Sequence, residues 1–395
     1  MNRAKAFSVP RPSPGNVRRK AVWSLAKAGA KWFAIFFALL AAGGFLFAWS
    51  GLYSVAASRG HWPGFSLILE FGMRSSVRTH SFGIDVPDLD DPALVERGAG
   101  HFQGGCAPCH GAPGRPSNPI VHAILPEPPD LGATIPTWKA NELFWIVKNG
   151  FKYTGMPAWA AQERDDEVWA IVAFLQRLPQ IDASQYREMA GLELREAIPI
   201  RALAQGGPMG TALAACSRCH GLDGKARASG AFPRLDIQTA DYLATQLEAY
   251  AAGTRDSGIM QPVAAELDAT DMRRLADYFA TQRPIGISVP AASQDSAFEL
   301  GRTMATAGMP DLGLPPCLSC HAEDPTSRSP LYPALAGQYA SFTAQQLALF
   351  KSGRRRGTPA AEIMSVMAER LTQEQIDAVS IYLAGLPARP AGEGN

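Results

Sequence analysis

The amino-acid sequence predicts an all-α protein, with one N-terminal transmembrane helix followed by three small helical domains in tandem. Three observations support this prediction. Residues 32–49 carry no charge, which is typical of a membrane-spanning helix. One pentapeptide pattern, C-x-x-C-H, occurs three times, at spacings of 110 and 101 residues. The chain around the second copy recurs one hundred residues later, around the third.

The N-terminal part begins with a basic segment, residues 1–31, which holds eight basic residues and no acidic one. The uncharged stretch that follows would span about 27 Å as a helix, close to the thickness of a bilayer core. Trp32 and Trp49 lie at its ends, where interfacial aromatic residues are common. We therefore expect a cytoplasmic N-terminus, a transmembrane anchor over residues 32–52, and the rest of the chain outside. The alternative is a cleaved signal peptide, with Ser54-Val55-Ala56 as the cleavage site, although signal sequences usually have shorter apolar regions.

Residues 53–90 are expected to link the anchor to the first domain. Within them, Trp62, Phe65, Leu69 and Met73 recur at helical spacing. This helix would lie on lipid headgroups, contact a membrane partner or pack on the first domain, and the sequence does not decide between the three.

The three C-x-x-C-H motifs use every cysteine in the protein. The pattern is the attachment signature of c-type haem, in which the two thiols form thioethers with the porphyrin and the following histidine binds the iron. A single C-x-x-C also suits a zinc half-site or a redox dithiol, but three copies that each end in histidine favour haem. We therefore predict three covalently attached haem c groups. The predicted attachment residues are Cys106, Cys109, Cys216, Cys219, Cys317 and Cys320, and the predicted proximal ligands are His110, His220 and His321.

The motifs divide the remaining chain into three expected domains, at residues 91–180, 201–284 and 296–387. In the first, an opening helix from Pro92 to Phe102 leads into the motif. A closing helix follows, with Asp165 or a neighbour as its N-cap, and Leu178-Pro179 ends it. The expected linkers are residues 181–200 and 284–295, and the expected disordered tail is residues 388–395.

The second and third domains are recognisable copies of each other. Matched pairs include Phe232-Pro233 with Tyr332-Pro333, Gln238 with Gln338, Arg255 with Arg355 and, after a four-residue insertion, Ile259-Met260 with Ile363-Met364. So regular a repeat indicates a duplication.

A six-coordinate haem iron needs a second axial ligand, and histidine or methionine is usual. The histidines outside the motifs are His61, His80, His101 and His122, and none lies in the second or third domain. Met156, on a Gly-Met-Pro loop, is the candidate for the first haem, with His101 and His122 as weaker alternatives.

Methionine is therefore expected to bind the second and third haems, unless a ligand crosses between domains or the site is open. The repeat indicates Met260 for the second haem, whereas Met272 is more typical of a helix face. It indicates Met364 for the third haem, with Met367 as an alternative.

Several neighbours have expected supporting roles. The backbone carbonyls of Pro129, Pro233 and Pro333 are placed to accept the proximal histidine Nδ1 proton, which would fix the imidazole. Arg255 and Arg355 would either pair with haem propionates or lie on a solvated surface.

These residues resemble a known family. Each domain resembles a class I cytochrome c, with an opening helix, C-x-x-C-H, a methionine loop and a closing helix that crosses the opening one. The second and third domains together resemble the dihaem cytochromes of the c4 type, on residues 332–338, Gln346-Leu347 and Met364. The first resembles mono-haem domains with a Thr-Gly-Met-Pro loop.

The resemblance covers roughly residues 91–387. It implies histidine–methionine ligation, fairly high potentials and haems packed near one another in the dihaem part. The sequence departs from the pattern at Ala322-Glu323-Asp324, where the second domain has Gly221-Leu222-Asp223-Gly224. This difference concerns the local loop and not the ligation.

Charge and motif content exclude several classes of function. The formal net charge is +1, but outside the N-terminal segment 29 basic residues face 36 acidic ones, which argues against a nucleic-acid partner. The sequence contains no recognisable nucleophile–base pair, phosphate loop or zinc site. We therefore expect an electron-transfer protein rather than an enzyme, since a haem peroxidase needs a five-coordinate iron.

The leading hypothesis is a tri-haem cytochrome c on the bacterial inner membrane, single-pass, with its haem domains in the periplasm. It would transfer electrons between respiratory partners, toward a terminal haem–copper oxidase. The expected redox partners are that oxidase, a quinol-oxidising complex or a dehydrogenase. The alternative is the cytochrome subunit of a periplasmic alcohol or sugar dehydrogenase complex.

Overall fold

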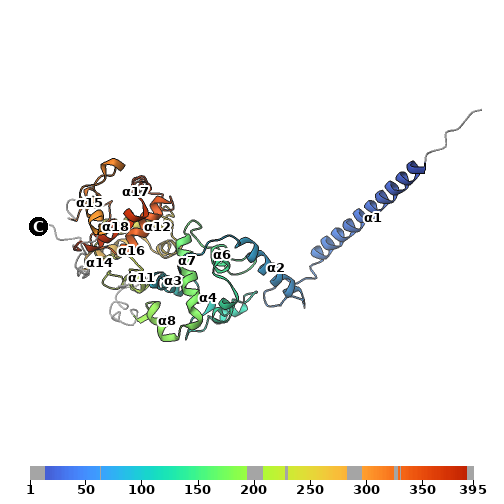
Figure 1. Cartoon of the computed structure of the whole chain (residues 1–395). Coiled ribbons are helices and arrows are strands. Elements are labelled where there is room, and N and C mark those ends of the chain that lie inside the picture. The colour runs from blue at the N-terminus through green and yellow to red at the C-terminus, as the bar shows by residue number, and fades with distance from the viewer. Residues whose placement is uncertain are drawn as a thin grey trace, which may run out of the picture. The chain divides into compact units, whose positions relative to one another are not determined.

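The computed structural model describes residues 14–62, 64–193, 208–226, 230–282, 296–323, 328–329 and 331–388. Their regular structure is helical apart from two isolated β-bridges, so the all-α prediction is confirmed. The chain divides into two compact units, Met1–His61 and Trp62–Asn395 (Figure 1). Parts of the expected basic N-terminus, linkers and tail, together with Asp324, lie outside the described residues.

The N-terminal unit consists mainly of α1, Pro14–Ser50. Within it, Leu25–Ser50 is long and apolar enough to cross a membrane, and all of these side chains are exposed. The helix begins well before Trp32 and ends at Ser50, close to the expected end of the anchor. After it, the Tyr53 hydroxyl lies 2.7 Å from His61 Nδ1.

The second unit begins with α2, Phe65–His80. Its C-terminal half packs on α6, Ala140–Asn149, with Val77 fully buried and the Arg74 guanidinium 4.8 Å from the centre of the Trp138 ring. This half is therefore a helix packed on the segment that carries the first motif. The N-terminal half leaves five apolar side chains exposed: Phe65, Leu67, Ile68, Leu69 and Phe71.

We call residues 91–193, 208–282 and 296–388 the first, second and third segments. In the first and third segments the helix that precedes the motif packs against the closing helix, and in the second segment the helix that ends with the motif does so. These helix pairs are α3 (Pro92–Gly105) with α7 (Asp165–Arg177), α11 (Pro208–His220) with α14 (Ala269–Ala280), and α15 (Ser296–Thr306) with α18 (Gln373–Gly385).

The crossings in the first and third segments require glycine. A Cβ atom on Gly98 would lie 2.0 Å from the Ala170 carbonyl oxygen, and one on Gly301 would lie 2.1 Å from that of Ala378. Any larger residue would force the two helices apart, because real Cβ atoms do not approach a backbone oxygen so closely.

The other helices of the three segments lie along the chain between the members of these pairs or between one pair and the next. They are α4 (Ala107–His110), α5 (Leu131–Thr134), α8 (Ala183–Met189), α12 (Ala240–Ala251), α13 (Met260–Ala265), α16 (Ala340–Lys351) and α17 (Pro359–Glu369). Short 3₁₀ turns lie at Pro119–Ala123, Ile135–Thr137, Leu178–Gln180, Pro310–Leu312 and Cys317–Ser319.

The start of α7 agrees with the expectation of an N-cap at Asp165 or a neighbour. The N-cap is its neighbour Arg164, which makes no side-chain capping hydrogen bond. Asp165, Asp166 and Glu167 fill the first turn instead, where negative charge is favoured by the helix dipole. The end agrees with the prediction, since the helix stops at Arg177, directly before Leu178-Pro179.

The second and third segments pair through two matched glutamines. The Gln238 amide donates to the Ala334 carbonyl (2.9 Å) and accepts from the Ala334 N–H (2.8 Å). The Gln338 amide makes the same pair of bonds with the backbone of Arg234, at 3.1 and 3.0 Å. Because positions 234 and 334 correspond in the repeat, the two segments hold each other by reciprocal contacts.

Candidate haem-binding sites

All three motif histidines have one ring nitrogen engaged in the same way. Nδ1 lies within hydrogen-bond distance of a proline carbonyl, as the sequence predicted. The distances are 3.0 Å for His110–Pro129, 3.1 Å for His220–Pro233 and 2.9 Å for His321–Pro333. An Nδ1 that donates to a carbonyl leaves the Nε2 lone pair available, which is the nitrogen a metal would use.

None of the six motif cysteines forms a disulfide bond in the structure. Burial raises the pKa of Cys106 and of Cys216 to about 12 and that of Cys317 to about 11. Their surroundings therefore favour an uncharged sulfur over a thiolate. An uncharged thioether is compatible with such surroundings.

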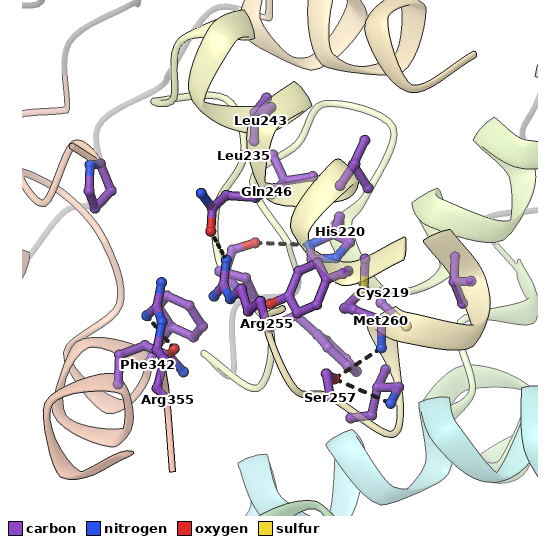
Figure 2. Close-up of a pocket in the computed structure, with 18 of the residues that line it drawn as sticks. Cys219, His220, Leu235, Leu243, Gln246, Arg255, Ser257, Met260, Phe342 and Arg355 are labelled. Atoms are coloured by element: carbon purple, nitrogen blue, oxygen red, sulfur yellow. Dashed lines mark hydrogen bonds between the residues drawn. The ribbon is translucent and has the colours of Figure 1, made fainter. Parts of the chain in front are cut away.

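A cavity of about 570 Å³ lies between the second and third segments and is also lined by residues of the first. Seven of its lining residues were predicted from the sequence as haem-binding: Cys106, Cys216, Cys219, His220, Met260, His321 and Met364. Figure 2 shows Cys219, His220 and Met260 around one part of this cavity, which Arg255 and Arg355 also reach. The structure thus brings together the whole predicted set of the second site. For the third site it brings together His321 and Met364, whereas Cys317 and Cys320 do not line the cavity.

The alternative methionines lie elsewhere. Met272 is buried on α14, as expected of a helix-face residue. Met367 packs on the hydrophobic core between α15 and α18, whereas Met364, one turn earlier, faces the cavity. The position of Met364 thus supports it over Met367 as the proposed ligand.

In the first segment, only Cys106 of the predicted set lines this cavity; Cys109, His110 and Met156 do not. Met156 lies on a turn in which its N–H donates to the Thr154 hydroxyl (3.1 Å) and its carbonyl accepts from the Phe151 N–H (3.2 Å). The loop therefore holds the methionine backbone in place.

The two alternative histidines of the first segment have contrasting environments. His122 has both ring nitrogens engaged, Nδ1 with Glu127 (2.5 Å) and Nε2 with Ser117 (3.3 Å), and it is exposed. The His101 Nε2 is buried without a hydrogen-bond partner among the described residues, and its ring lies edge-on to Trp159. Burial, followed by nearby arginines, lowers the pKa of His101 to about 3.

Two arginines that line the cavity, Arg255 and Arg355, show whether its lining suits a haem. Arg255 and Arg355 each bond a glutamine and stack on an aromatic ring, and no ion pair with an acidic residue is found for either in the described part of the chain. Burial and the charge of Arg255 lower the pKa of Arg355 to about 10. An apolar cavity that carries two such cations suits an apolar ligand with carboxylates, as haem is. The contacts are Arg255–Gln246 and Arg355–Gln346, both 2.5 Å, with Tyr250 and Phe350 as the rings, at 4.5 and 4.4 Å.

Comparisons with known proteins agree with this chemistry. A family described as "Cytochrome C oxidase, cbb3-type, subunit III" matches residues 93–175, and one described as "Cytochrome c" matches residues 299–387. The thiosulfate dehydrogenase electron acceptor of Thiomonas intermedia is 34% identical over 177 residues, which cover 45% of this chain and 81% of that protein. The chain belongs to the cytochrome c family.

Other cytochromes c match a similar share of the chain. Cytochrome c4 of Azotobacter vinelandii is 33% identical over 183 residues, which cover 44% of this chain and 85% of that protein. The crystal structure of reduced cytochrome c4 from Pseudomonas stutzeri is 32% identical, covers 46% of this chain and 97% of its own, and gives a TM-score of 0.40. The resemblance drawn from the motifs is confirmed: the chain has cytochrome c domains, which carry covalently bound haem c and transfer electrons.

Sequence reasoning missed three residues beside the second site of this cytochrome: Trp159, Glu167 and Ser257. All three line the cavity, and Glu167 is buried in α7. One signal was present, because Glu167 lies four residues before Ile171, on the face that helical periodicity assigns to the core. A carboxylate on the core-facing side of a helix indicates that a hydrogen-bond or ion-pair partner is buried beside it.

Proposed function

We propose that this protein is a membrane-anchored periplasmic cytochrome c that carries three haems and relays electrons between redox proteins. The main support is the common geometry of the three motifs, each with its histidine bonded to a proline carbonyl. The cavity supports electron exchange within the chain, because proposed haem-binding residues of the second and third sites, and Cys106 of the first, border one shared space.

The protein's own residues would have defined roles at each site. Haem iron, when bound, supplies a one-electron couple. The cysteines hold the porphyrin, and His110, His220 and His321 provide the proximal nitrogen, oriented by the proline carbonyls. The thioethers of Met156, Met260 and Met364 complete the ligation and favour a high potential, which suits delivery of electrons to an oxidase.

We propose a terminal haem–copper oxidase as the electron acceptor. The match of residues 93–175 to a family described as a cbb3-type oxidase subunit supports this direction. The second candidate is a role as the cytochrome subunit of a periplasmic dehydrogenase. The relative from Thiomonas intermedia, which is described as the electron acceptor of a thiosulfate dehydrogenase, favours that role.

Two measurements test these proposals. A pyridine haemochrome assay on the purified chain should give three haems c per polypeptide, and two or fewer would contradict the assignment. Purification from native membranes in mild detergent then identifies the partner through its cofactors. Copper with haem a or b in the co-purifying complex would support the oxidase. A dehydrogenase subunit with its own cofactor would support the second candidate.

A further inference from the structure

Glu167 of the first segment reaches into the second segment. Its side chain is almost fully buried. Its Oε1 accepts a hydrogen bond from the Ser257 hydroxyl, and its Oε2 accepts one from the Gly258 N–H, both at 2.7 Å. The Trp159 indole N–H also donates to Oε2, at 3.2 Å.

Ser257 connects Glu167 to the backbone of Met260, the proposed methionine ligand of the second haem. Its hydroxyl oxygen accepts from the N–H groups of Ile259 (3.2 Å) and Met260 (3.0 Å), at the start of α13 (Figure 2). The Ser257 hydroxyl donates its one proton to Glu167, and its oxygen accepts from two backbone N–H groups. Its whole hydrogen-bonding capacity is therefore used. The backbone at Met260 is therefore held by a two-step chain of hydrogen bonds that begins in another segment.

A second contact fixes the same loop. Arg164 Nη2 lies 3.0 Å from Glu167 Oε1, and its Nη1 donates to the Asp256 carbonyl at 2.7 Å. Burial raises the pKa of Glu167, and Arg164 counteracts this rise. Since the four groups that contact the carboxylate are all donors, they match its ionised form, which only accepts.

Among the described residues of the third segment there is no equivalent of this arrangement. The residue three positions before Met364 is Ala361, which has no hydroxyl. Helix α17 begins earlier, at Pro359, and its N-cap is Thr358, whose side chain accepts from the Ala361 N–H at 3.2 Å. Met364 therefore lies inside a helix that its own segment caps, whereas Met260 begins a helix that the first segment holds in place.

We propose that Glu167 is a positioning residue for the second haem, which acts through Ser257 to fix the Met260 thioether on the iron. The docking of the first segment thereby sets the ligation of the second site. This inference rests on the proposed role of Met260 as an axial ligand.

Two possible effects of Glu167 differ in sign. If the carboxylate acted only by its negative charge, its removal would make the nearby iron easier to reduce, and the potential would rise. If the carboxylate positions Met260, its removal loosens the thioether, and the potential falls, because methionine ligation raises it.

The test compares Glu167→Ala and Ser257→Ala with the unchanged full-length holoprotein in detergent. Potentials come from a spectroscopic redox titration, and ligation from the near-infrared thioether-to-iron band. We expect the potential of one haem to fall by at least 59 mV, a tenfold change in its oxidation equilibrium, with a weakened band on that haem alone. The other two haems should be unchanged. Glu163→Gln is the matched control, since it removes a charge from an exposed position four residues earlier and should change nothing.

A rise in potential with an intact band would show that Glu167 acts as a charge and would overturn the positioning role. Unchanged potentials and bands in both variants would overturn it as well. Met260→Ala separates this result from a wrong ligand assignment: if Met260 does not bind iron, its replacement leaves every band intact. Haem content and the midpoint of urea unfolding show whether each variant is folded. Glu167→Gln, which keeps the side-chain volume, replaces the alanine variant if that one does not fold.

Discussion

Single residues decide the ligation of each proposed haem site. The three methionines were selected from the sequence by elimination and by the repeat, and the structure places Met260 and Met364 in the shared cavity. The repeat favoured Met364, but the sequence left Met367 open as an alternative, because the two lie three residues apart on one helix. The packing of Met367 on the core and the position of Met364 at the cavity separate them.

Replacing Met156 tests the first site. Met156→Ala should lower the potential of one haem and remove one thioether band, because the iron loses the ligand that raises its potential. A redox titration with near-infrared spectra measures both. An unchanged titration would refute the assignment, and His101→Gln in the same assay then tests the alternative ligand.

The buried ion pair of Arg234 and Asp236 distinguishes the two repeats at the residue scale. Both side chains are fully buried, 2.5 Å apart, while the third segment has Ala334 and Ala336 at these positions. Asp236→Asn should destabilise the protein by about 3–5 kcal/mol, since it leaves a buried guanidinium without its counter-charge.

Urea unfolding of the holoprotein measures this loss. The control is Asp241→Asn, which removes the carboxylate of an exposed pair with Arg273 and should cost at most about 1 kcal/mol. Equal effects of the two substitutions would contradict the role assigned to burial.

The buried His101 gives a pH dependence with a definite sign. Its folded-state pKa of about 3 lies below the usual value of 6.5, mainly because burial disfavours the imidazolium. Between these values the unfolded chain binds the proton and the folded chain does not. The contribution of neutral His101 to the free energy of unfolding is therefore fully present above pH 6.5. It decreases as the pH falls from 6.5 toward about 3, by about 1.4 kcal/mol per pH unit.

His101→Phe should remove that part of the pH dependence. The measurement is the free energy of unfolding in urea at several pH values between 6.5 and 4, for the variant and the unchanged protein. Equal slopes in the two proteins would show that His101 is protonated in the folded state.

At the scale of elements, α1 and α2 differ in how well the sequence predicted them. A membrane-spanning helix can be predicted from an uncharged apolar stretch alone, so the N-terminal helix was predicted directly from hydropathy. The role of α2 depended on what covers each of its faces, which a single sequence does not contain. The structure shows that its C-terminal half packs on α6.

The proposed anchor predicts that the N-terminal residues remain in the mature protein. Intact mass measurement of the protein from native membranes should include residues 1–56, and extraction should require detergent. Loss of these residues, with release by a salt wash, would identify a cleaved signal sequence instead. A variant that begins at Tyr53 behind a cleavable signal peptide should be soluble with the same haem content.

At the scale of the whole molecule, the sequence predicted the parts and not their contacts. Motifs and repeats appear as patterns within the sequence, so the cytochrome c domains were recognisable. The first turn of α7 contacts both other segments, since Asp165 pairs with Arg354 (3.3 Å), Asp166 accepts from Gln345 (2.8 Å) and Glu167 bonds Ser257. Such pairs, 90 to 189 residues apart, leave no periodicity or spacing from which they could be inferred.

The contact between the repeats can be tested through Gln238. Gln238→Ala should destabilise the protein by about 1–3 kcal/mol, because it leaves the buried N–H and carbonyl of Ala334 without partners. Gln338→Ala should have a similar effect on the backbone of Arg234. Urea unfolding measures both, and the exposed Gln373→Ala serves as a control. If either glutamine variant matched the control, the reciprocal contacts would not contribute to stability.

The reciprocity of Gln238 and Gln338 has an evolutionary consequence. Twofold homodimers have interfaces of this kind, in which the two subunits make the same contacts with each other. An ancestral chain with one such domain would therefore have formed this interface with a second copy of itself. Fusion of the two copies into one polypeptide would allow each half to change alone, which fits the Arg234–Asp236 pair opposite two alanines.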